Sequence, residues 1–237
     1  TSCIKKDELD KSKEIRDWLL KINNQSDINL FVELNSIIAN RFAAFNGIKG
    51  DLQYVRQSIV SLGKILEGRL NKHNNKKHFV IPDSDRVIEQ SLWYAIIIIY
   101  GKCFSDASSG RKVKLESKEC FKNKIELKSV HEKIINERNN FIAHGGSSSS
   151  DQTHVGIFYK ITPSTEMHET IGYRRAVAFS PGLDELKRYL FLIEYLITVV
   201  DKKIKKIHEK LKNEVSEIPR EDLLERIINE NKKYFNK

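Results

Sequence analysis

Glycine, proline and cysteine are scarce in this chain of 237 residues, which contains 11 Gly, 4 Pro and 3 Cys. Collagen-like and proline-rich disordered proteins need far more glycine and proline, so both classes are excluded. Abundant Leu, Ile, Lys and Glu with few helix breakers favour helix over sheet. Cys3, Cys103 and Cys120 are odd in number and show no CxxC spacing, which argues against a disulfide framework and against a thiolate zinc site. We therefore expect a mainly α protein in a reducing compartment, the cytoplasm.

Long hydrophobic runs are also missing. The longest, residues 92–100 (LWYAIIIIY), is far shorter than the ~18–20 residues that cross a bilayer. The first residues, TSCIKKDELDKSKE, lack the apolar core of a signal peptide, so we expect no membrane partner. Basic residues outnumber acidic ones by 41 to 32, which gives a net charge of +9. Such a charge favours attraction to polyanions, although it says nothing about the fold.

The first part of the chain, residues 1–78, is expected to be a helical extension. Apolar spacing predicts a short helix over residues 7–22 and a second helix that starts near Asp27 and stops at the Asn46-Gly47 pair. Asp51 is expected to cap a third helix, so that the second and third form an antiparallel helical hairpin. Residues 79–237 are expected to form the other domain, unless the whole chain is one continuous domain.

The second part is expected to be a helical bundle with a small β insertion. Helices are predicted over residues 82–101 and 126–144, joined by a polar connection with at most one short helical turn. The Ser-rich residues 145–153 are expected to form a flexible loop. A β-hairpin is predicted over about 154–179, with a long turn at 163–165. Apolar residues then alternate at steps of three and four over a long helix, about 183–213, before a final helix from Pro219.

Most signatures of enzyme chemistry are absent. The chain contains no phosphate-binding GxxxxGK[ST], no GxGxxG, no HExxH and no GxSxG. Its seven His are scattered without the spacing of metal ligands. We therefore expect no metal and no cofactor.

One segment differs from this background: ERNNFIAHG, residues 137–145. The guanidinium of Arg138 suits a phosphate group, and the imidazole of His144 can exchange a proton with a ribose hydroxyl near neutral pH. Six helical residues separate their directions by about 120°, so one helix does not bring both to one face. Two copies of the helix around a two-fold axis would do so more easily. A simpler interpretation stays open, in which His144 only stabilises the end of a helix, Arg138 is an ordinary surface residue and Asn139-Asn140 end the helix.

The same segment resembles the signature of the HEPN superfamily, an Arg followed by a polar residue and, a few positions later, a His. Residues 93–105 (WYAIIIIYGKCFS), the basic Gly110-Arg111-Lys112 loop and His131-Glu132 add to the likeness. It covers roughly residues 86–146 and, more loosely, the long helix from Leu183, but not residues 1–75. The resemblance implies an all-helical, dimeric and often metal-independent endoribonuclease of phage-defence, toxin–antitoxin or RNA-processing systems. It implies that Arg138 and His144 are the catalytic pair and that Asn139 is the polar residue.

Basic residues near this segment are candidate RNA contacts: Arg111, Lys112, Lys160, Arg174 and Arg175. Tyr159 and Tyr173 are candidates for base stacking, whereas the lysines of the long helix are better explained as the solvated rim of its apolar seam. We therefore expect a metal-independent endoribonuclease with an RNA substrate, a homodimer through the motif helix, and an antitoxin or other regulatory partner. The alternatives are a non-catalytic HEPN-like module that binds RNA or protein, and a scaffold that oligomerises through residues 183–211.

Overall fold

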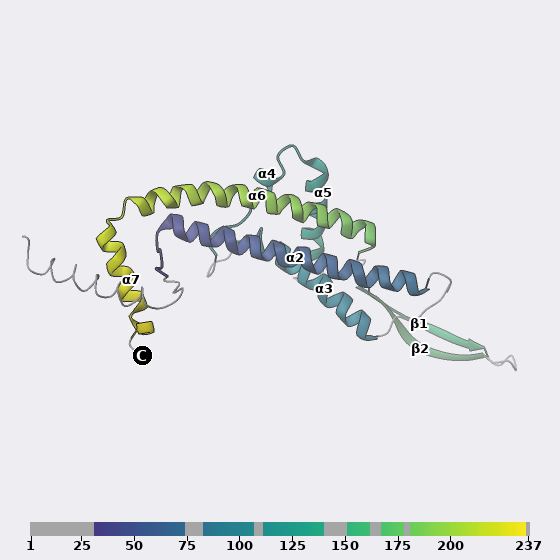
Figure 1. Cartoon of the computed structure of the whole chain (residues 1–237). Helices are drawn as coiled ribbons and strands as arrows, with labels where there is room; N and C mark the ends of the chain where they lie inside the picture. Colours follow the sequence, from purple (N-terminus) through teal and green to yellow (C-terminus); the bar gives the residue numbers. More distant parts are fainter. Residues whose placement is uncertain are drawn as a thin grey trace, which may run out of the picture. The chain divides into compact units, whose positions relative to one another are not determined.

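The computed structural model describes residues 31–73, 83–106, 111–139, 151–161, 167–177 and 181–235 (Figure 1). The described residues are mainly helical with one small sheet, as the sequence predicts. The elements in chain order are α2 (Ile37–His73), α3 (Asp83–Lys102), α4 (Ser117–Cys120), α5 (Ile125–Glu137), β1 (Asp151–Ile161), β2 (Met167–Val177), α6 (Leu183–Ser216) and α7 (Arg220–Phe235). The helix expected over 7–22 lies outside the described residues.

The two helices expected around Asn46-Gly47 are wrong, because α2 runs unbroken from Ile37 to His73. Asn46 and Gly47 are exposed, whereas Phe45 and Ile48 on either side of them are buried. A glycine inside a helix costs roughly 0.5–1 kcal/mol, but each large apolar side chain buried by the continuous helix contributes roughly 1.5–3 kcal/mol. Burial therefore outweighs the stop signal, and no antiparallel hairpin forms at this point.

Contacts among the described residues group the chain into two compact units. One consists of residues 44–204, and the other joins the residues up to Ala43 with those from Lys205 onward. The boundary expected between residues 78 and 79 lies outside the described residues and stays a prediction. None of the described helices is long and apolar enough to span a membrane.

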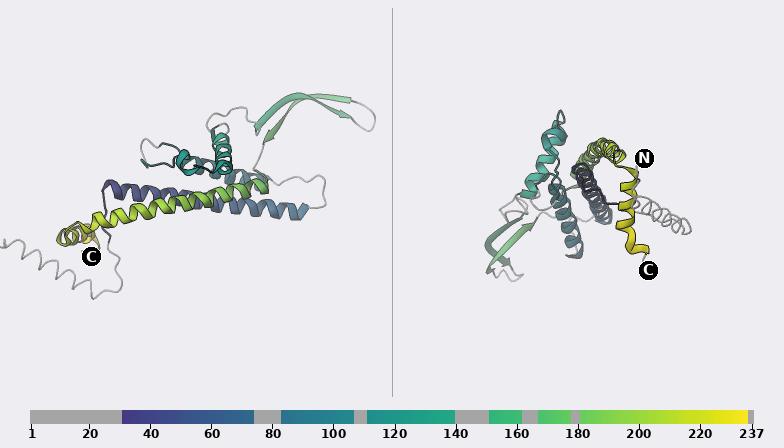
Figure 2. Two further views of the ribbon diagram at one scale, coloured as in Figure 1. Left: turned by 90° about the horizontal axis from the view of Figure 1, so that it is seen from above. Right: turned by 90° about the vertical axis from the view of Figure 1, so that its left-hand side faces the viewer.

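The core of the larger unit is formed mainly by α2, α3 and α6. α2 and α6 run side by side (Figure 2). Ion pairs from Lys49 to Asp201 at 2.8 Å and from Arg56 to Glu194 at 3.2 Å join the two helices. The long helix predicted over about 183–213 is confirmed as α6, which ends slightly later than expected. Its fully buried side chains are Leu186, Tyr189, Leu192, Ile193, Leu196 and Val200.

The predicted helix 82–101 is confirmed as α3, which includes the β-branched run Ile96–Ile99. Ile96 and Ile97 are buried, whereas Ile98 is 45% exposed, so the run is buried on one side of the helix and not all round. The ring of Trp93 in α3 stacks on Tyr189 of α6 with centroids 5.7 Å apart. Two α3 residues behind Trp93, Ile96 and Ile97, are fully buried. α3 thus connects α6 with the segment that follows.

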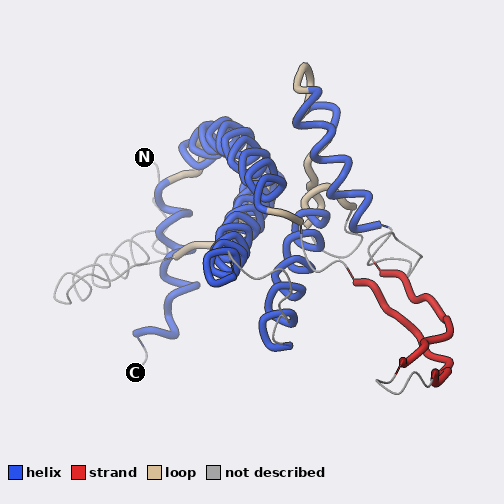
Figure 3. The backbone as a smooth tube through the Cα atoms, turned by 90° about the vertical axis from the view of Figure 1, so that its right-hand side faces the viewer, coloured by secondary structure: helices blue, strands red, loops and turns tan. Residues whose placement is uncertain are grey.

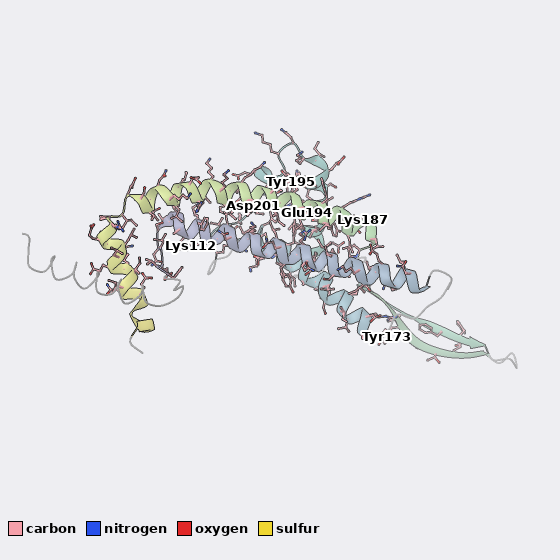
Figure 4. All side chains as sticks on the ribbon, in the orientation of Figure 1. Lys112, Tyr173, Lys187, Glu194, Tyr195 and Asp201 are labelled. Carbon is pink, nitrogen blue, oxygen red and sulfur yellow. The ribbon has the colours of Figure 1, made fainter. Side chains whose placement is uncertain are left out.

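The connection between α3 and α5 is polar in composition but contributes to the core. Leu115, Cys120 and Phe121 are buried, and the backbone N–H of Leu115 donates to the carbonyl of Cys103 at 2.8 Å. The single short helical turn predicted here is α4. The hydroxyl of Tyr195 in α6 donates to the Cys120 carbonyl at 2.6 Å, which holds α4 on α6 (Figure 4).

The predicted hairpin is confirmed as the antiparallel pair β1 and β2 (Figure 3). Its register pairs Val155 with Tyr173 and Ile157 with Ile171. β1 already begins at Asp151, so the last residues of the expected Ser-rich loop are strand. The turn expected at 163–165 lies outside the described residues.

In the smaller unit, α7 confirms the final helix predicted from Pro219. The carboxylate of Glu230 in α7 accepts a hydrogen bond from the backbone N–H of Glu33 at 2.8 Å. The rings of Phe42 in α2 and His208 in α6 stack with centroids 5.7 Å apart.

Candidate functional site

The motif residues Arg138 and Asn139 directly follow α5. The backbone N–H of Arg138 donates to the carbonyls of both Ile134 and Ile135, and residues 138–139 continue the helix as a π turn. Such turns are rare and often mark functional positions. The helix expected up to residue 144 is therefore described only as far as Asn139, and His144 lies outside the described residues.

The side chain of Arg138 lies against the end of α3 at Gly101. A Cβ atom added to Gly101 would lie 2.1 Å from Cδ and 2.6 Å from Nε of Arg138, so any larger residue would collide with the arginine. Gly101 lies in a helix and is itself buried. The absence of a side chain at this position therefore allows the aliphatic stem of Arg138 to approach the α3 backbone.

Arg138 is half-buried. Its Nη1 donates to Oδ1 of the neighbouring Asn139 at 3.5 Å, and within the described ranges no carboxylate pairs with it. A guanidinium whose stem is packed and whose charge has no acidic partner can bind an oxyanion such as a phosphate. Asn139 is exposed and can offer an amide to the same ligand.

His131, one residue before Glu132 in the motif helix, has a structural role. It is buried among the rings of Tyr100, Phe104 and Phe121, and its Nδ1 shares a hydrogen bond with the Tyr100 hydroxyl at 2.8 Å. Burial lowers the pKa of His131 to about 4, so the ring is neutral at physiological pH. This cluster fastens α5 to α3 and to the segment containing α4, which fixes the helix that carries Arg138.

The acidic end of α6 adds a second support for α5. Lys133 of α5 pairs with Glu185 of α6. The Tyr189 hydroxyl donates to the same carboxylate at 2.9 Å, and burial raises the pKa of Tyr189 far above its ordinary value. The side of α5 opposite Arg138's contact is therefore held by a charged and aromatic network.

Arg111, predicted to contact RNA, is instead engaged inside the protein. Its Nη2 donates to Oδ2 of Asp51 in α2 at 2.7 Å, and both side chains are largely buried. Lys102 also reaches Asp51, at 3.3 Å. The prediction that Asp51 caps a helix is therefore wrong. Asp51 lies in the middle of α2 and anchors the connection after α3 to that helix.

Lys112, the next candidate, is exposed and has no ion pair with any described residue (Figure 4). It remains available for a phosphate. The other three candidates, Lys160, Arg174 and Arg175, are strand residues, and the register pairs Lys160 with His168, Arg174 with His154 and Arg175 with Thr153. Consecutive strand residues alternate between faces, so Arg174 and Arg175 occupy opposite faces of the hairpin.

The described cysteines are poor nucleophiles. Cys103 and Cys120 are buried, and burial raises the pKa of their thiols to about 12 and about 11. Both thiols are therefore protonated at neutral pH, and only the thiolate is reactive. Among the described residues, no three His, Cys, Asp or Glu side chains gather as a metal site would require.

The structure thus brings together Arg138, Asn139 and Gly101, but it does not bring Arg111 to them as a free cation. The role of Gly101 was not predicted, although this glycine is the last residue of the helix predicted over residues 82–101. His131 was named only as part of the family resemblance, and its position in a buried aromatic cluster was not predicted. No family model, curated protein or solved structure matches this chain.

Proposed function

We propose that this protein is a metal-independent endoribonuclease of HEPN type that acts as a homodimer, in a phage-defence or toxin system. The observation that supports the proposal is the packing and the hydrogen bonding of the Arg138 side chain. The stem of this residue is held against Gly101, its guanidinium has no carboxylate partner among the described residues, and Asn139 lies beside it. These are the properties that a phosphate-binding arginine needs.

In the proposed reaction, the ribose 2′-oxygen attacks the adjacent phosphorus and the bond from phosphorus to the 5′-oxygen breaks. His144 accepts the proton of the 2′-hydroxyl, and the departing 5′-oxygen receives a proton from a second acid, either water or the other His144 of the dimer. Arg138 stabilises the charge that develops on the phosphate oxygens. The products are a 2′,3′-cyclic phosphate and a 5′-hydroxyl.

A two-fold arrangement explains how Arg138 and His144 could serve one phosphate. In an α-helix continued to residue 144 the two positions would diverge by about 120°, so a second copy of the motif helix would supply the missing residue more readily than the same chain does. The homodimer would therefore form near the end of α5. An antitoxin or regulatory protein that covers this end would block the site.

The proposal is tested by incubating purified protein with mixed RNA in excess EDTA and measuring fragment formation. Arg138→Ala and His144→Ala should each lower the cleavage rate by at least ~10²-fold, the usual cost of losing an acid–base group or a positioned charge. Arg56→Ala is the matched control, because Arg56 is a half-exposed arginine of α2 whose partner is Glu194. Its cleavage rate should equal that of the unchanged protein.

Two other results separate the alternatives. RNA binding that Arg138→Ala weakens, with no cleavage by any variant, would favour the non-catalytic RNA-binding module. Cleavage at an unchanged rate in both motif variants would contradict the assignment of the catalytic residues.

A further inference from the structure

The β-hairpin carries an apolar face that the motif site does not use. Strand residues alternate between faces, and the register aligns Val155 with Tyr173, Ile157 with Ile171 and Tyr159 with Glu169 on the same face. Five of these six side chains are apolar or aromatic. We call Val155, Ile157, Tyr159, Ile171 and Tyr173 the hairpin apolar face.

All five side chains of the hairpin apolar face are exposed, by 54% to 78%. Five neighbouring large side chains exposed to this extent form a contiguous apolar patch, which monomeric soluble proteins rarely expose without a function. A lone two-stranded hairpin is at best marginally stable in water. A contiguous surface of this kind is characteristic of a binding surface.

Charge favours a protein over RNA as the occupant of this face. The adjoining positions on the same face are Glu169, Asp151 and Arg175, so acidic residues outnumber basic ones. The basic residues Lys160 and Arg174 occupy positions on the opposite face. A polyanion would be attracted to that opposite face and not to the apolar one.

The order of residues along the face makes it complementary to itself. Along this face the hairpin has four successive levels, each set by one cross-strand pair of residues. In order they carry Arg175, then Val155 with Tyr173, then Ile157 with Ile171, then Tyr159 with Glu169. A two-fold axis between the two middle levels sets apolar levels against each other. It also sets Arg175 of each copy opposite Glu169 of the other.

We propose that the hairpin apolar face binds the same face of a second copy of this chain, with the two hairpins antiparallel across a two-fold axis. Two sheets packed in this way lie about 10 Å apart. A specific interface needs about 1,000 Å² of buried surface in total, so the contact has to extend over the whole hairpin apolar face of both copies. The proposal is independent of the ribonuclease activity and adds an interface at the hairpin.

The first test measures self-association of the full chain by analytical ultracentrifugation. Because dimers formed through α5 would associate further through the hairpin, each variant is judged by the dissociation constant of the association step that it changes. Ile171→Glu puts a carboxylate in the middle of the interface and should raise the dissociation constant at least tenfold. Thr170→Glu is the matched control, because Thr170 is the exposed preceding strand residue on the opposite face, and its dissociation constant should not change. A monomer at all concentrations, or an equal effect of both variants, would overturn the proposal.

A charge exchange shows whether an effect comes from misfolding of the hairpin. Glu169→Arg and Arg175→Glu each place like charges opposite one another and should each raise the dissociation constant severalfold. The double variant restores opposite charges and should return the dissociation constant to that of the unchanged chain. No recovery in the double variant would overturn the two-fold register.

The same variants separate this proposal from the proposed function. If the dimer forms only through the end of α5, Ile171→Glu would leave association unchanged and the hairpin proposal would fail while RNA cleavage persisted. If Tyr173→Ala weakened RNA binding without changing association, the face would be an RNA platform, which also contradicts the proposal.

Discussion

Replacing Gly101 with alanine tests how Arg138 is held. The new Cβ would lie 2.1 Å from Cδ of Arg138, so the arginine stem must leave its position. In a chain with Arg138→Ala no stem is present, and the substitution only gains helix propensity, roughly 0.5–1 kcal/mol. With Arg138 present, the collision adds an overpacking cost of about 1–3 kcal/mol.

A double-mutant cycle measured by urea denaturation isolates this collision. Gly101→Ala should stabilise the Arg138→Ala variant but leave the parent chain unchanged or destabilised, with a coupling free energy of at least about 1 kcal/mol. Gly63→Ala, in the interior of α2 with no atom within 4 Å of the added Cβ, is the control and should have the same effect in both backgrounds.

RNA cleavage gives the second readout of the same variant. Gly101→Ala should lower the cleavage rate nearly as much as Arg138→Ala does, because the guanidinium is displaced. Equal stability changes in both backgrounds of the cycle would refute the inferred contact between the two residues. Full cleavage activity in the Gly101→Ala variant would refute the inference that this contact positions the guanidinium.

Three further predictions concern stability. Because burial lowers the pKa of His131 from 6.5 to about 4, the unfolded chain binds a proton that the folded chain does not, so stability present above pH 6.5 is lost as the pH falls toward 4. This loss is about 3 kcal/mol, and urea denaturation at several pH values should show that His131→Phe removes this part of the slope. Asp51→Ala leaves the largely buried Arg111 without its 2.7 Å partner and should cost about 1–3 kcal/mol, with strong coupling to Arg111→Ala in a thermodynamic cycle; independent effects would contradict the pair. Glu89 is only 2% exposed and bonds Arg69 at 2.7 Å, so Glu89→Ala should cost about 3 kcal/mol in chemical denaturation, whereas a cost below 1 kcal/mol would contradict its burial.

The helices could be predicted from sequence wherever local periodicity and tertiary burial agree. α6 and α3 are examples, since Leu186, Ile193 and Val200 of the α6 repeat are buried, as are Trp93, Ile96 and Ile97 of α3. Prediction failed at Asn46-Gly47, where the local stop signal was stronger than any visible reason to continue. That reason is burial of Phe45 and Ile48 against other elements, which only the folded chain reveals.

The candidate site was predictable in its residue types but not in its partners. Arg138 and Asn139 were identified from the motif alone, because a guanidinium and an amide can bind a phosphate whatever surrounds them. Arg111 was predicted as an RNA contact, and its ion pair with Asp51 could not be predicted because Asp51 lies 60 residues earlier in the chain. Gly101 was overlooked for a similar reason, because a close approach between helices leaves no pattern in a single sequence.

The chemistry of the RNA ends tests the central claim most directly. The protein is incubated with a single-stranded RNA of defined sequence in EDTA, and the downstream fragment is labelled at its 5′ end with polynucleotide kinase without prior phosphatase treatment. The proposed mechanism predicts that the fragment accepts the label, because its 5′ end is a hydroxyl, and that no fragment forms with Arg138→Ala or His144→Ala. A fragment with a 5′-phosphate, or one made equally by the two variants, would contradict the mechanism.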